Sequence, residues 1–232
     1  MVPTERLRQA GKAATVISVG TDRRCKPREC RPGMANFQGE FLFHRSTPVT
    51  SQPVVRPSKQ EYFLLLALAA RTRADCLGRR VGAVVVRDDR VISTGYNGTP
   101  IGMPNCSEDG CHRCANRDTE AYPAGRGYDL CICVHAEQNT VLAAARFGQS
   151  TLGATLYSTM RPCFGCLKES LQAGISAVHY LEDWQVPPGD DDAALAAQYA
   201  ALRSRFQDFS QARIPDHRLA RLLAEERVGT ET

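Results

Sequence analysis

Two short motifs rich in metal-binding side chains constrain the fold of this chain more than any other feature. The first is His135-Ala-Glu137, and the second is Pro162-Cys163-Phe-Gly-Cys166. Each motif stands at the start of a segment with helical spacing of apolar residues, and a predicted strand separates the two segments. If these side chains act together, the fold must bring two helix starts side by side.

The residue types in these motifs match one tetrahedral metal site. Cys163 and Cys166 lie three residues apart, so they share one face of a helix that Pro162 opens favourably. With His135 they predict one imidazole and two thiolates as ligands of zinc, and the fourth position is left for water. Zinc lowers the pKa of bound water from about 15.7 to about 7.

Glu137 is predicted to move protons rather than to bind the metal. It is two residues from His135, so it can point at the bound water, and a closed, dry pocket would raise its pKa towards the working range. The alternative is a structural zinc site in a non-catalytic interaction module. Such a site has no need of a proton shuttle, so Glu137 argues against it.

The remaining periodicity predicts an α/β fold. Ser58 and Glu61 have capping-box spacing and open a helix of about 18 residues that ends near Gly78. Strands are predicted at 81–86, 91–96, 155–159 and 177–181, and further helices at 134–147, 162–173, 193–206 and 216–227. This order favours a sheet with helices on its faces.

Charge and the order of the predicted elements together divide the chain into three parts. Residues 1–57 carry 10 Lys+Arg and 4 Asp+Glu, whereas the remainder carries 19 and 21. We expect a disordered, basic N-terminal tail over 1–57, one enzyme domain over 58–185 and a C-terminal helical extension over 186–232. The tail is either a targeting arm or a segment that precedes a true start at Met34, and the sequence leaves both open.

Composition also excludes several classes of protein. The longest apolar run, Tyr62–Ala70, has nine residues, which disfavours a membrane span. The acidic balance of residues 58–232 and an aromatic content of 7% disfavour a nucleic-acid-binding channel. The ten cysteines follow no signal-peptide pattern, so we expect a cytoplasmic protein that uses cysteine for metal rather than for disulfides.

A long insert over residues 99–133 shows no periodicity and is rich in Gly, Pro and Cys. Its cysteines are Cys106, Cys111, Cys114, Cys131 and Cys133. Four of them predict a second, structural zinc site, which either Cys131 or Cys133 completes, with His112 as an alternative fourth ligand. Cys76 is expected to be an ordinary core residue, and Cys25 and Cys30 free thiols in the tail.

On these motifs the chain resembles the cytidine/deoxycytidylate deaminase superfamily, and within it the deoxycytidylate (dCMP) deaminases, including those of late competence operons. The resemblance covers residues 58–185 and rests on VGAVVV, STGYNGTP, CVHAEQN, TLYSTMRPCFGC and AGISAVHY. The long Cys-rich insert sets the chain apart from cytidine deaminases and tRNA adenosine deaminases.

The resemblance implies a three-layer α/β/α sandwich with a mixed sheet of about five strands. It implies zinc-dependent hydrolysis of dCMP to dUMP, the thymidylate precursor, and ammonia. In the site it implies His135, Cys163 and Cys166 as zinc ligands and Glu137 as proton shuttle. It places Asn97 on the sugar hydroxyl and pyrimidine edge, and the backbone of Ala136 near the pyrimidine carbonyl. It further implies a second zinc in some members, a homo-oligomer that is commonly a hexamer, and control by dCTP and dTTP.

The substrate's phosphate needs donors, and Arg79, Arg80 and Arg161 are the candidates, because arginine grips phosphate through two N–H groups at once. The alternative is that they are solvated surface charges. Because those donors decide specificity, deamination of another free cytosine or purine nucleoside, nucleotide or base stays open. A nucleic-acid deaminase is a more distant alternative.

Overall fold

The computed structural model describes residues 56–122, 130–183 and 192–223. All of them lie within one compact unit, Ser51–Thr232. The predicted tail, including Cys25 and Cys30, lies outside the described residues except for its last two positions. Among the helices of the described part, none is long and apolar enough to cross a membrane.

A five-stranded mixed sheet forms the centre of this unit, in the order β2-β1-β3-β4-β5. The strands are β1 (Gly82–Arg87), β2 (Arg90–Tyr96), β3 (Thr155–Met160), β4 (Ala177–Glu182) and β5 (Asp208–Gln211). β1 runs antiparallel to both β2 and β3, whereas β3, β4 and β5 run parallel to one another. The predicted fold class is confirmed.

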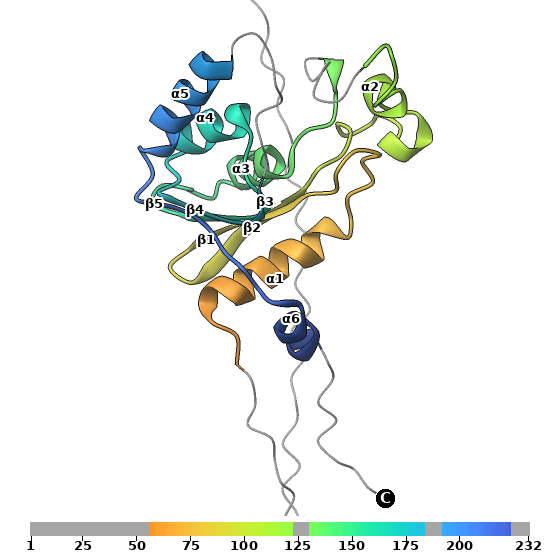
Figure 1. Ribbon diagram of the computed structural model, residues 1–232. Coiled ribbons are helices and arrows are strands. Elements are labelled where there is room, and N and C mark those ends of the chain that lie inside the picture. The colour runs from red at the N-terminus through yellow and green to blue at the C-terminus, as the bar shows by residue number, and fades with distance from the viewer. Residues whose placement is uncertain (1–55, 123–129, 184–191, 224–232) are drawn as a thin grey trace, which may run out of the picture. The chain divides into compact units, whose positions relative to one another are not determined.

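Helices cover both faces of the sheet (Figure 1). One face carries α1 (Lys59–Arg71), and α6 (Asp216–Leu223) lies beside it. The other face carries α3 (Ala136–Arg146), α4 (Phe164–Gln172) and α5 (Asp192–Arg203). The insert adds a 3₁₀ turn, η1 (Cys106–Glu108), and a short helix, α2 (His112–Ala115).

Strand β1 separates two hydrophobic cores. Ala83 and Val85 pack with α3, α4 and α5, whereas Val84 and Val86 pack with α1 on the opposite face. All four side chains are buried. A strand covered on both faces requires the unbroken apolar run that the sequence shows.

Helix α1 begins as predicted but ends early. The Ser58 hydroxyl accepts from the Glu61 amide at 3.2 Å, and the Glu61 carboxylate accepts from the Ser58 amide at 2.8 Å. The helix stops at Arg71 instead of near Gly78, and at its C-cap the Thr72 hydroxyl donates to the Ala69 carbonyl at 2.7 Å.

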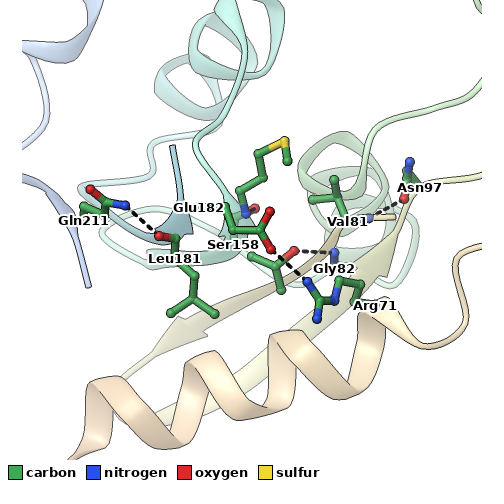
Figure 2. A network of polar contacts seen from close by, with 10 residues as sticks. Arg71, Val81, Gly82, Asn97, Ser158, Leu181, Glu182 and Gln211 are labelled. Carbon is green, nitrogen blue, oxygen red and sulfur yellow. Dashed lines mark hydrogen bonds and ion pairs between the residues drawn. The ribbon is translucent and has the colours of Figure 1, made fainter. Parts of the chain in front are cut away.

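The turn after α1 lets the start of β1 lie directly against the helix. A Cβ on Gly82 would come within 2.2 Å of the Ala67 carbonyl oxygen, so only glycine fits there. Arg71 then pairs with Glu182 at 3.0 Å and joins the end of α1 to β4, as Figure 2 shows.

The C-terminal extension, predicted as helical, also supplies a strand. Its helices are present as α5 and α6, but β5 pairs with β4 between them. The sheet is therefore not complete within residues 58–185. Arg218 of α6 also forms an ion pair with Glu61 at the start of α1, with Nη2 2.8 Å from Oε2.

Candidate metal and active site

His135, Cys163 and Cys166 meet where α3 and α4 begin. His135 is the N-cap residue of α3, and Cys163 is the N-cap residue of α4. The His135 Nδ1 atom lies 3.4 Å from the sulfur of Cys163 and 3.4 Å from that of Cys166. The two sulfurs are 3.5 Å apart.

This triangle of donor atoms fits one zinc ion. Zn–S bonds of about 2.3 Å and a Zn–N bond of about 2.0 Å give tetrahedral edges of about 3.8 Å between sulfurs and about 3.6 Å between nitrogen and sulfur. The observed separations lie within a few tenths of an ångström of these edges. Three protein ligands leave a fourth position open, as in catalytic zinc sites.

The start of α3 is held against β2 by close backbone packing and against α4 by one side chain. A Cβ on Gly95 would lie 2.4 Å from the Ala136 carbonyl oxygen, so β2 presses its bare backbone against the first turn of α3. Gln138 accepts from the His135 amide at 2.9 Å and donates to Glu169 of α4 at 2.9 Å. Gln138 thereby fixes the backbone of His135 relative to α4.

Glu137 points into the same site and is 5% exposed. Its Oε1 atom accepts a hydrogen bond of 3.0 Å from Ser158 of β3, and its Oε2 atom lies 3.6 Å from the Cys166 sulfur. Burial raises the pKa of this carboxyl group. A carboxylic acid of raised pKa beside a metal site is suited to exchanging protons near neutral pH.

The ligand side chains shift one another's pKa values. The hydrogen bond between Cys163 and Cys166 lowers the pKa of Cys163 to about 4. The Cys163 sulfur in turn raises the pKa of His135 to about 9. A metal binds the neutral form of an imidazole, so the affinity of such a site for metal rises with pH.

Asn97, the predicted substrate contact, holds the backbone just before β1. It is buried, its Oδ1 atom accepts from the Val81 amide at 2.7 Å, and its Nδ2 atom donates to the Arg79 carbonyl at 2.8 Å. Figure 2 shows Asn97 beside Val81. Each end of the amide has capacity for one further hydrogen bond, which is what its predicted contact with substrate would use.

Comparison with known proteins decides the family. Residues 57–182 match the family described as "Cytidine and deoxycytidylate deaminase zinc-binding region". The chain belongs to this family. The match spans both the His135 motif and the Cys163 motif, so zinc is the metal that the family assigns to this site.

Three relatives illustrate the range of the match. The deoxycytidylate deaminase of Saccharomyces cerevisiae is 40% identical over 161 residues, which are 68% of this chain and 48% of that protein. The deoxycytidylate deaminase of Mycobacterium phage D29 is 43% identical over 54% of this chain and 95% of that protein. ComE operon protein 2 of Bacillus subtilis is 36% identical over 57% of this chain and 64% of that protein. The chain spans about half the length of the yeast relatives that it matches.

A solved structure supports the fold. The dCMP deaminase of cyanophage S-TIM5, in complex with dCMP and dUMP, superposes with a TM-score of 0.50 at 24% identity. The superposition covers 68% of this chain and all of the phage chain. The likeness shows that the three-layer arrangement seen here is the deaminase fold.

The remaining predicted site residues of this deaminase-family chain differ in how far they are buried and in their partners. Ala136 is buried in the first turn of α3, and Arg79 and Arg80 are exposed. Arg161 pairs with Asp183 at 3.0 Å and lies over the ring of Tyr199 at 5.1 Å. Arg161 is thus already engaged by an acidic and an aromatic side chain, whereas Arg79 and Arg80 are exposed.

The five insert cysteines come together, and Cys76 joins them. Cys76 is buried as predicted, but its sulfur lies 3.9 Å from that of Cys114, so it is part of a cysteine cluster rather than an ordinary core residue. His112 is exposed, faces the ring of Tyr122 and is not part of the cluster.

Sequence reasoning also missed Ser158 and Gln138. Gln138 could have been found, because a glutamine three residues after His135 has capping-box spacing. Ser158 gives no local signal, since only the register of β3 brings it to Glu137.

Proposed function

We propose that this chain hydrolyses dCMP to dUMP and ammonia. The observation that supports this best is the buried carboxylate of Glu137 beside three zinc-type donors, in a family whose members named deoxycytidylate deaminase are 40% and 43% identical to this chain. His135, Cys163 and Cys166 would hold the metal. Zinc in such a site activates water for hydrolysis at neutral pH.

Glu137 carries the proton transfers in this proposal. It accepts a proton from the attacking water and passes it to ring N3, and it then accepts the proton of the new C4 hydroxyl and passes it to the amine that leaves. A C4–O bond forms and the C4–N bond breaks, so one water is consumed, one ammonia is released, and nothing is oxidised or reduced. The Ser158 hydroxyl holds Oε1, which leaves Oε2 on the side of the ligands.

Recognition of the phosphate is assigned to Arg79 and Arg80. Both are exposed, and the Arg79 carbonyl accepts from Asn97, so the two guanidinium groups start from an anchored backbone. Arg161 is a weaker candidate because Asp183 and Tyr199 already contact it.

Self-association is also part of the proposal. Exposed apolar side chains lie at the end of β2, on α3 and directly after α3: Tyr96 is 40% exposed, Leu142 58% and Phe147 72%. Such side chains together with the edge strand β2 favour a homo-oligomer, whose mass light scattering would measure. The hexameric state, control by dCTP and dTTP, and a cytoplasmic location stay predictions.

The test is product formation by the purified full chain offered dCMP, dCTP, deoxycytidine, CMP and cytidine, with bound zinc measured on the same sample. We expect dCMP to turn over well above the other four. Preferred turnover of a different compound would replace dCMP with that substrate. Bound zinc without turnover of any of them, even with dCTP added as activator, would overturn the proposal.

A further inference from the structure

Six cysteines outside the catalytic site form a second cluster of potential metal ligands. They are Cys76, Cys106, Cys111, Cys114, Cys131 and Cys133. These cysteines form two overlapping groups of four, and within each group all four sulfurs lie within 4.8 Å of one another. The first group is Cys76, Cys106, Cys114 and Cys133, and the second is Cys111, Cys114, Cys131 and Cys133. Cys114 and Cys133 belong to both groups.

The sulfur separations match metal coordination rather than disulfide bonding. The Cys114 sulfur lies 3.6 Å from that of Cys131 and 3.9 Å from those of Cys76 and Cys133. The Cys111 and Cys131 sulfurs are 3.8 Å apart. Sulfurs on one tetrahedral zinc are about 3.8 Å apart, whereas a disulfide bond is about 2.05 Å long. All six cysteines are free.

From the shared pair we infer that this cluster binds two zinc ions, bridged by the sulfurs of Cys114 and Cys133. One ion would take Cys76 and Cys106 as its other ligands, and the second would take Cys111 and Cys131. A single zinc ion in either group would leave two of the six cysteines without metal. Two ions with two shared thiolates give every sulfur a metal and each ion four ligands.

The charge of this arrangement is moderate. Six thiolates with two zinc ions carry a formal charge of about −2, equal to that of one zinc with four thiolates. Backbone amides face the terminal sulfurs of the first group: Leu77 donates to Cys106 at 3.4 Å, and Gly78 donates to the Cys76 sulfur at 3.4 Å. Such donors stabilise sulfur in its charged, metal-binding form.

The cluster would tie three distant segments to the catalytic site. Cys76 follows α1, Cys106 to Cys114 belong to the insert, and Cys131 and Cys133 lead into α3. Cys133 is two residues from His135, so the second metal centre fixes the segment that delivers the catalytic histidine. This inference does not depend on which compound the enzyme deaminates.

Metal content of the wild-type full chain is the first test. Elemental analysis should find about three zinc ions per chain, two in the cluster and one at His135. After exchange with ¹¹³Cd, two resonances of four-sulfur sites should show coupling to each other through the shared sulfurs. About two ions per chain, uncoupled cadmium signals or a disulfide among the six cysteines would each overturn the inference.

Single serine variants locate the ions. Cys114→Ser removes a ligand from both and should lose both, whereas Cys76→Ser and Cys111→Ser should each weaken one ion. Cys163→Ser is the control and should remove only the catalytic zinc. A change of metal content in only one of Cys76→Ser and Cys111→Ser would instead indicate one ion. Should these variants fail to fold, the cadmium coupling in the wild-type chain still decides.

The same samples separate this inference from the proposed function. Glu137→Gln should keep all of the zinc while losing turnover. A chain with the two bridged ions but no activity on dCMP would support the cluster and contradict the substrate.

Discussion

Gly98 and Val134 exchange both of their backbone hydrogen bonds, with N–O distances of 3.2 and 2.8 Å. This pair joins the end of β2 to the segment that enters α3. Because Asn97 precedes Gly98 and His135 follows Val134, this backbone pair links two of the predicted site residues. A substitution that disturbs the backbone at the end of β2 should therefore also displace the segment that carries His135, and the reverse should hold.

Asn97→Ala should destabilise the protein. The variant leaves the Val81 amide and the Arg79 carbonyl without their side-chain partner, which we expect to cost about 2–3 kcal/mol. Denaturant unfolding measures this loss. Asn139→Ala, which removes one bond to the Tyr96 carbonyl, is the matched control and should cost about 1 kcal/mol. An unchanged unfolding free energy with a raised KM would instead assign Asn97 to substrate alone.

Glu137→Gln should abolish proton transfer while leaving the metal in place. The amide is nearly the same size but cannot accept and return a proton, so kcat should fall about 10²- to 10⁴-fold. Zinc content should equal that of the wild type. Glu120→Gln, an exposed glutamate in the insert, serves as control. Substantial turnover by the Glu137 variant would remove Glu137 from the mechanism.

Ser158→Ala should lower kcat by about 10- to 100-fold with little change in KM. The Ser158 hydroxyl holds one oxygen of Glu137, and a hydrogen bond to a charged group contributes about 1.5–3 kcal/mol. Ser170→Ala is the control, because the Ser170 hydroxyl is buried and has no hydrogen-bond partner among the described residues. Equal kinetics for both variants would deny Ser158 a positioning role.

Arg79→Ala and Arg80→Ala should separate substrates with and without a phosphate. We expect at least one variant to raise KM for dCMP about 10-fold or more and to leave KM for deoxycytidine unchanged. Arg161→Ala should lower thermal stability and affect both substrates alike, since its partners are Asp183 and Tyr199. A defect specific to dCMP that is seen in Arg161→Ala alone would instead assign recognition of the phosphate to Arg161.

Acid stability should depend on Glu61. The hydrogen bond from Arg218 lowers the pKa of Glu61 from its ordinary value of 4.5 to about 2. A lowered folded-state pKa contributes stability above the unfolded pKa, and that contribution is lost as pH falls through the folded value. The loss should therefore fall between about pH 4.5 and 2.

Glu61→Gln tests this window, because glutamine keeps the capping-box spacing but removes the charge. Its unfolding free energy should decline less steeply than that of the wild type between pH 4.5 and 2, and Glu120→Gln should follow the wild type. Parallel curves for wild type and Glu61→Gln would show that the ion pair with Arg218 contributes nothing.

The sequence predicted best what local spacing controls. Cys163 and Cys166 share a helix turn, and the unbroken apolar run of β1 reflects burial on both faces. Cys76 was misread because its approach to Cys114 depends on where α1 ends, and the predicted helix continued to near Gly78 instead of ending at Arg71. The family resemblance implied about five strands, but the position of the fifth was missed, because Asp208–Gln211 is too short to show a period and gains its partner from β4.

The contact of Arg218 with Glu61 makes the first and last described helices neighbours in space. The two helices could therefore keep their positions in the fold even if their order along the chain were changed. A circular permutant that joins residue 223 to residue 56 through a flexible linker, and opens new ends at the exposed turn of Gly148 and Gln149, should retain the sheet, both cores and the metal ligands.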